Sequence, residues 1–264
     1  MRYVEQGINK DLVDFIRFLI TVFSLNILLT NDDGINALGI KKVESILKQY
    51  GNVYVVAPKH EQSGKGCSIN AFKGVNIEKI DNNHIAVEGS PVDCVEIALS
   101  ILNVDFDLVV SGCNAGYNLS QDIMYSGTCG ACLQASFGNC KAIALSIKNQ
   151  DYFDLLDTYL PMTMDFIFKN DLLSTNYFLN VNFPINLNKK QFKITKVKDI
   201  IKESYYPIDN TMKNNYIVAR KSIDENVNHD VDFVAVKNGF ISITPLSQTL
   251  YKTKFYNEIK RKIK

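Results

Sequence analysis

Two neighbouring carboxylates, Asp32 and Asp33, are the residues of this sequence whose type and spacing most directly indicate chemistry. Adjacent carboxylates repel each other unless a cation or a proton lies between them. In a continuing strand the two side chains would point to opposite faces, but a turn, which Gly34 permits, can direct both to one place. The pair therefore predicts either an all-oxygen site for a hard cation such as Mg²⁺ or Mn²⁺, or a plain turn and helix cap.

Two further polar clusters follow apolar runs that read as buried strands. Residues 61–64 (EQSG) come shortly after the run 53–57, and residues 111–114 (SGCN), with Asn118, come after the run 108–110. Ligands of open parallel sheets bind outside the carboxyl ends of the strands. We therefore expect both clusters to face the Asp32-Asp33 pair.

One more polar segment, residues 125–130 (YSGTCG), reads as a loop that enters a helix. Backbone N–H groups at such a helix start, together with the hydroxyls of Ser126 and Thr128, can hold a phosphate. The alternative reading is an ordinary Ser or Thr cap, and the sequence does not decide between the two. No P-loop or dinucleotide-binding motif occurs in a suitable context.

The elements that must position these residues alternate between short apolar runs and stretches with helical periodicity. This alternation predicts an α/β fold with βαβ units and a mostly parallel sheet flanked by helices. The expected strands are 26–30, 53–57, 108–110 and 142–147, and the expected helices are 37–50, a Ser90-capped helix to about 102, one from about 126, and 151–169. Residues 75–80 and 84–88 read as a hairpin. After about residue 175, β-like runs at 177–183, 192–197, 216–219 and 240–244 predict a C-terminal β-rich extension.

Composition limits the remaining possibilities. The chain has 264 residues, 46% of them hydrophobic, with 29 basic and 28 acidic side chains, so nothing in its charge favours nucleic-acid binding. We expect one α/β domain over 25–250, an extra helical or poorly ordered segment over 1–24, and a solvated basic tail over 251–264. The apolar stretch 12–29 is interrupted by Asp14, Arg17 and Asn26 and has no signal-peptide cleavage site, so no membrane partner is expected.

The six cysteines, with no signal peptide, are interpreted as reduced thiols of a cytoplasmic protein. Cys129 and Cys132 have a C-x-x-C spacing, but no second pair exists for a zinc site, so we interpret them as packing residues. The three histidines are scattered, and we expect no catalytic role for His84.

With these clusters in place, the sequence resembles the SurE (survival protein E) family of 5′-nucleotidases. The matching stretches occur in family order and are 27–34, 56–58 with 62–64, 89–95, 110–116 with Asn118, 125–128, 142–146, 180–184 and 242–246. The resemblance implies a Rossmann-like core whose C-terminal β extension exchanges between protomers of a homodimer or homotetramer. Departures at Ala115 and Gln134 leave the fine substrate preference open.

The resemblance also implies the roles of individual residues. One divalent metal ion, Mg²⁺ or Mn²⁺, would be held by four oxygen ligands, which are Asp32, Asp33, Ser63 and Asn114. Phosphate contacts would come from Asn118, Ser126, Gly127 and Thr128. The expected reaction is hydrolysis of a nucleoside 5′-monophosphate, in which Asp32 or Asp33 orients or deprotonates the attacking water.

Two alternatives remain open at this point. An aspartyl-phosphate phosphatase also carries Asp at the end of a first strand, but such enzymes need two Asp separated by one residue, and here the two are adjacent. A nucleotide-binding regulatory protein without turnover is the other alternative, and the intact set of proposed ligands argues against it.

Overall fold

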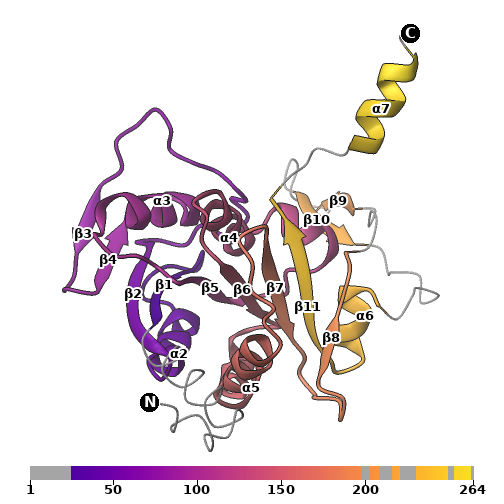
Figure 1. Ribbon diagram of the computed structural model, residues 1–264, viewed down its shortest axis with the longest axis horizontal. Helices are drawn as coiled ribbons and strands as arrows, with labels where there is room; N and C mark the ends of the chain where they lie inside the picture. The colour runs from indigo at the N-terminus through magenta and orange to yellow at the C-terminus, as the bar shows by residue number, and fades with distance from the viewer. Residues whose placement is uncertain (1–24, 198–202, 208–215, 221–229, 249–252, 263–264) are drawn as a thin grey trace, which may run out of the picture.

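A nine-stranded sheet forms the centre of the computed structural model, with the strands in the order β3-β4-β2-β1-β5-β6-β7-β11-β8 (Figure 1). The structure describes residues 25–197, 203–207, 216–220, 230–248 and 253–262, so the prediction for residues 1–24 lies outside it. Neighbouring strands of the sheet are parallel except in the pairs β3-β4 and β7-β11. The expected mostly parallel sheet is therefore confirmed. Its strands are β1 Leu25–Thr30, β2 Gly51–Pro58, β3 Ile77–Lys79, β4 His84–Val87, β5 Leu108–Ala115, β6 Ala142–Ile147, β7 Tyr177–Phe183, β8 Phe192–Ile194 and β11 Ile241–Ser247.

Helices cover both faces of the sheet, and β1 shows how alternate residues meet the two layers (Figure 1). Ile27 and Leu29 pack in one apolar cluster with α2 and α5, and Leu28 packs in the other with α3 and α4. All three side chains are completely buried, which explains why the strand reads as an uninterrupted apolar run. The long helices are α2 Leu38–Leu47, α3 Pro91–Ile101, α4 Gly127–Phe137 and α5 Leu156–Lys169, the last preceded by the 3₁₀ helix η2 Gln150–Leu155.

Local signals in the sequence are confirmed at the start of α3 and in the core. The Ser90 hydroxyl accepts the backbone N–H of Asp93, and the Asp93 carboxylate accepts the N–H of Ser90, which forms the capping box of α3. Cys129 and Cys132 are free, buried thiols in the cluster between α4 and the sheet. Their interpretation as packing residues is therefore confirmed.

Strand β5 differs from the prediction, which ended it at Val110 and placed a loop from Ser111 onward. The strand continues to Ala115, because the backbone of Ser111, Asn114 and Ala115 pairs with β6 across an irregularity in register. Gly112, with φ +122°, has no room for a side chain, since an added Cβ would lie 2.3 Å from the Leu145 carbonyl oxygen. Polar residues here are held by backbone pairing, which composition alone does not reveal.

The chain after residue 175 continues the same sheet through β7, β11 and β8. Strands β9 Glu203–Pro207 and β10 Tyr216–Arg220 form a separate antiparallel pair, and the short helix α6 spans Asp232–Lys237. The basic tail, for which no helix was predicted, contains α7 Thr253–Lys262, which extends away from the sheet in Figure 1. An ion pair between Lys262 and Glu258 one turn apart, at 3.0 Å, supports this helix. Of the helices that the structure describes, none combines the length and apolar character that a bilayer crossing requires.

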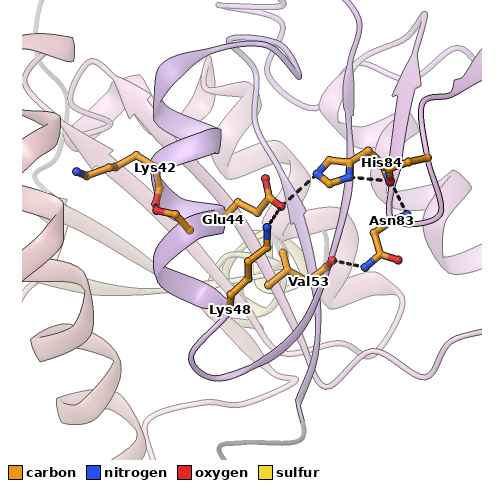
Figure 2. Close-up of polar contacts among 8 residues, drawn as sticks. Lys42, Glu44, Lys48, Val53, Asn83 and His84 are labelled. Atoms are coloured by element: carbon orange, nitrogen blue, oxygen red, sulfur yellow. Dashed lines mark hydrogen bonds and ion pairs between the residues drawn. The ribbon is translucent and has the colours of Figure 1, made fainter.

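The predicted hairpin is confirmed as β3 and β4. His84, the first residue of β4, contacts carboxylates of the hairpin and of α2 (Figure 2). Its Nδ1 lies 2.8 Å from the Asp81 carboxylate, and its Nε2 lies 3.2 Å from the carboxylate of Glu44 on α2. Glu44 also pairs with Lys48 at 2.6 Å. His84 thus connects the hairpin to α2.

Candidate active site

The Asp32-Asp33 turn follows β1 directly, and neighbouring backbone groups hold its shape. The Asn31 side-chain amide donates to the Gly34 carbonyl oxygen at 2.9 Å, and Gly34 has a φ of +103°, which favours glycine. The Ile35 N–H donates to the Pro58 carbonyl oxygen at the end of β2. The predicted turn is therefore confirmed.

Asp32 is 3% exposed, and both of its carboxylate oxygens face the start of α4. Oδ1 accepts the Thr128 hydroxyl at 2.7 Å, and Oδ2 accepts the Thr128 backbone N–H at 3.2 Å. Burial raises the pKa of Asp32, whereas the hydrogen bonds from Thr128 and Gly127 act in the opposite direction. Gly127 must lack a side chain, since a Cβ there would lie 2.9 Å from the Asp32 Cβ.

Asp33 is half-buried beside Asp32. Burial, followed by the negative charge of Asp32, raises the pKa of Asp33 to about 6; Glu61 adds to this shift and the Ala115 N–H opposes it. A cation bound at this place would offset the repulsion between these carboxylates.

Ser63 and Asn114 approach Asp32 from the two neighbouring strand ends. The loop after β2 is tied to the turn, because the Gln62 N–H donates to the Asp32 carbonyl oxygen at 2.7 Å. The Ser63 hydroxyl donates to Glu61 at 2.9 Å, and the Asn114 side-chain amide donates to the Gly116 carbonyl oxygen at 2.8 Å. The second of these bonds orients the Asn114 side chain.

A hollow of about 270 Å³ brings most of the predicted site residues together. Asp33 lies beside it, next to Asp32, and is not part of its lining. Tyr117 and Asp122 were not predicted, since nothing in their local sequence distinguishes them from loop residues, and Tyr125 lay in the predicted segment 125–130 without an assigned role. The lining residues are Asp32, Ser63, Gly64, Asn114, Tyr117, Asn118, Asp122, Tyr125 and Ser126.

The donor set of this hollow fits a hard divalent cation. Carboxylate, hydroxyl and amide oxygens are the ligands that Mg²⁺ and Mn²⁺ prefer, and the paired negative charges of Asp32 and Asp33 would be offset by such an ion. Within the described ranges no group of three or more His, Cys, Asp or Glu side chains is arranged to hold a metal. A ligand set of two carboxylates with Ser63 and Asn114 therefore stays a prediction.

Two of the predicted phosphate-binding residues, Ser126 and Thr128, have different surroundings at the start of α4. Ser126 caps α4 by accepting the Cys129 N–H at 3.1 Å, and it lines the hollow. Thr128 directs both its hydroxyl and its N–H to Asp32. A phosphate contact from Thr128 stays a prediction, but the described contacts make this residue a support for Asp32.

Asn118 is held by residues from two further strands that sequence reasoning did not assign to the site. Its backbone N–H donates to Asn182 at 2.9 Å, and its carbonyl oxygen accepts the side-chain amides of Asn180 and Asn182 at 2.8 and 3.1 Å. Its own side-chain amide donates to the Ser146 hydroxyl at 2.8 Å. Asn180, Asn182 and Ser146 stood in matching stretches of the sequence, but only their place on β6 and β7 beside Asn118 reveals their role.

Comparison with known proteins identifies the family of this chain. The family model described as survival protein SurE matches residues 27–206. The chain belongs to the SurE family. A relative from Wigglesworthia glossinidia brevipalpis, named 5′/3′-nucleotidase SurE, is 35% identical over 241 residues, which are 89% of this chain and 96% of the relative.

Other SurE proteins give the same picture. One from Histophilus somni (strain 2336), named 5′-nucleotidase SurE, is 35% identical over 232 residues, covering 84% of this chain and 92% of its own. The crystal structure of the SurE protein from Aquifex aeolicus matches with a TM-score of 0.78 and 32% identity, covering 90% of this chain and 100% of that one. The α/β fold is therefore the fold of a SurE protein.

Proposed function

We propose that this SurE chain is a metal-dependent 5′-nucleotidase that hydrolyses nucleoside 5′-monophosphates to nucleoside and phosphate. The observation that carries the proposal is the hollow at the strand ends, which Asp32, Ser63 and Asn114 line together with Asn118 and Ser126. It joins a cation-binding set of oxygens to donors suited to a phosphate. The names of the relatives, which are 5′-nucleotidases at 33–35% identity, support the same activity.

We propose that Asp32, Asp33, Ser63 and Asn114 hold one divalent cation, Mg²⁺ or Mn²⁺. When bound, such an ion supplies Lewis acidity toward a phosphoryl oxygen and lowers the pKa of a bound water. Thr128 keeps the Asp32 carboxylate in one orientation through two hydrogen bonds. Asn118 and the Ser126 end of α4 contribute donors toward the equatorial phosphoryl oxygens, where negative charge is concentrated in the transition state.

The proton of the attacking water passes to a carboxylate of the chain. Water forms a bond to phosphorus, the bond from phosphorus to the 5′ oxygen breaks, and the leaving oxygen takes up a proton from solvent water, while the carboxylate returns its proton to solvent. Both Asp32 oxygens are engaged by Thr128, so the geometry favours Asp33 as the acceptor of the water proton.

The experiment is a panel of phosphomonoesters assayed with Mg²⁺, with Mn²⁺ and with EDTA. The proposal expects phosphate release from AMP or GMP that requires a metal and stops with EDTA. A phospho-enzyme trapped during turnover would contradict direct hydrolysis and support the aspartyl-phosphate alternative. Binding of AMP without phosphate release, under every metal condition, would support a regulatory protein instead.

The proposal also covers the oligomeric state of the chain and its location in the cell. We propose a homodimer or homotetramer in which the C-terminal β extension exchanges between protomers, and the β9-β10 pair outside the main sheet supports it. Six cysteines without a disulfide in the structure support a reducing, cytoplasmic location. Light scattering of the full chain, compared with the 29.8 kDa of one protomer, tests the assembly.

A further inference from the structure

Ser120 is anchored to a residue 112 positions later in the chain. Its backbone N–H donates to Asp232 Oδ2 at 2.6 Å, and its hydroxyl donates to Asp232 Oδ1 at 3.1 Å. Ser120 has a φ of +53°, a backbone conformation that a residue with a side chain keeps only where its surroundings hold it. Asp232 supplies that restraint, because one carboxylate binds both donors of Ser120.

Asp232 is itself fixed from the opposite side. Its side chain is completely buried at the first position of α6, and its Oδ1 also accepts the Phe233 N–H at 2.8 Å. Its own backbone N–H donates to the Lys196 carbonyl oxygen at 3.1 Å, next to the bridge between Lys196 and Val231. Burial raises the pKa of this carboxyl group, and the Ser120 and Phe233 hydrogen bonds oppose that shift. The anchor is therefore rigid with respect to the C-terminal part of the sheet.

The segment that Asp232 holds forms one wall of the candidate active site. Ser120 begins the 3₁₀ helix η1 (Ser120–Met124), which lies between Asn118 and Ser126 in the chain. Both of these residues, and Asp122 within η1, line the hollow. Asn118, two residues before Ser120, is fixed by β6 and β7. Asp232 therefore supplies the second attachment of this wall, through Ser120. From there the chain runs on to Ser126, which caps α4.

We propose that Asp232 is a positioning residue for phosphoryl transfer, which holds η1 so that the phosphate-facing wall of the hollow keeps its shape. The inference rests on the proposed nucleotidase function and adds a residue of the C-terminal part to it. Asp232 acts through Ser120 and does not line the hollow. Its loss changes the handling of phosphate and leaves the cation ligands in place.

The experiment compares Asp232→Ala and Asp232→Asn with Thr195→Val in the full chain. Thr195 is a matched control, since its buried hydroxyl bonds Ser242 and Thr244 in the same C-terminal part without touching η1. Readouts are kcat and KM for AMP, inhibition by inorganic phosphate, Mn²⁺ affinity, and amide hydrogen exchange of residues 116–126. Activities are compared at a temperature where every variant is folded.

In Asp232→Ala we expect kcat/KM to fall roughly 10- to 100-fold, the scale of a misplaced binding group, with weaker phosphate inhibition. Mn²⁺ affinity should stay at the wild-type value, and exchange of 116–126 should speed up. Asp232→Asn should recover part of the activity, because its amide oxygen still accepts the Ser120 N–H. Thr195→Val should keep wild-type kcat/KM even where it lowers stability.

An Asp232→Ala protein with wild-type kcat/KM and phosphate inhibition would overturn the proposal, as would an equal loss in Thr195→Val. If Asp232→Ala does not fold, Ser120→Ala and Asp232→Asn decide, and wild-type phosphate inhibition in both would refute the role. A wild-type protein without turnover but with Mn²⁺ binding would instead refute the nucleotidase function. In that case, faster amide exchange of residues 116–126 in Asp232→Ala would show that Asp232 still holds η1. Failure of the nucleotidase function would then be distinguished from failure of the positioning role.

Discussion

Thr128 donates both its hydroxyl and its backbone N–H to the carboxylate of Asp32, at 2.7 and 3.2 Å. This relationship joins the turn after β1 to the start of α4 across 96 residues of sequence. It fixes which way the first predicted cation ligand points, because a buried carboxylate keeps the orientation that satisfies its donors.

Replacing Thr128 by valine should therefore impair the site while preserving side-chain volume. Thr128→Val removes one hydrogen bond to a buried charge, which should destabilise the fold by about 1–3 kcal/mol and reduce activity roughly 10-fold or more. Thr128→Ser keeps both donors and is the matched control, expected near wild-type activity. Urea unfolding and a phosphate-release assay measure the two effects. Equal activity of the valine and serine variants would remove the positioning role of the hydroxyl.

Neutralising the carboxylate pair should abolish most turnover without unfolding the chain. We expect Asp33→Asn, and separately Asp32→Asn, to lower activity by at least ~10²-fold, the low end for loss of a general base. Mn²⁺ should raise the Tm of the wild type, since a ligand that binds the native state stabilises it, and should raise that of Asp33→Asn much less. Asp105→Asn, at an exposed carboxylate outside the site, is the control. Near-normal turnover of either site variant in a metal-titrated assay would refute the ligand assignment.

Gly127 should not tolerate even one added methyl group. In Gly127→Ala the new Cβ would lie 2.9 Å from the Asp32 Cβ and 3.1 Å from the Pro91 Cγ, so the turn or the helix must shift. Overpacking of this kind costs about 1–3 kcal/mol, and here it should also displace Asp32 and reduce activity. Gly74→Ala, where nothing lies within 4 Å of the added Cβ, is the control. Thermal unfolding with a parallel activity assay tests the contrast, and an active, stable Gly127→Ala protein would show that the turn adapts.

His84 should make stability depend on pH without affecting catalysis. Burial lowers the pKa of His84, but the hydrogen bonds to Asp81 and Glu44 outweigh it, so the pKa in the folded state is raised. The stabilisation is then fully present below about pH 6.5, the pKa of an unperturbed histidine, and is lost as the pH rises through the folded-state value. We expect His84→Gln to lower the free energy of unfolding at pH 6 and to change it little at pH 9, with kcat unchanged.

The control for this pH effect is Lys48→Gln, which removes the other partner of Glu44. A lysine keeps its charge between pH 6 and pH 9, so this variant should lose a similar amount of stability at both values. Urea unfolding at the two pH values measures both variants. A loss in His84→Gln that is equal at pH 6 and pH 9 would contradict the ionic role of the histidine.

Much of the sheet could be predicted from local sequence, because strands buried on both faces read as apolar runs. Ile27, Leu28 and Leu29 form such a run, and the Ser90 cap marked the start of α3 as clearly. The predicted end of β5 at Val110 was wrong, because the strand continues through residues that are not apolar. Its last residues are polar and belong to the strand only through backbone hydrogen bonds to β6, which leave no trace in local composition.

Local sequence was enough to predict that polar residues gather at the carboxyl ends of parallel strands, and Asp32, Ser63 and Asn114 do line one hollow there. The contacts that fix the residues in and around this hollow come from distant parts of the chain. Thr128 on Asp32, Asn182 on Asn118 and Asp232 on Ser120 are contacts over 96, 64 and 112 residues. Their partners are set by how distant elements pack, because a buried carboxylate or amide must find its hydrogen-bond partner wherever the fold supplies one.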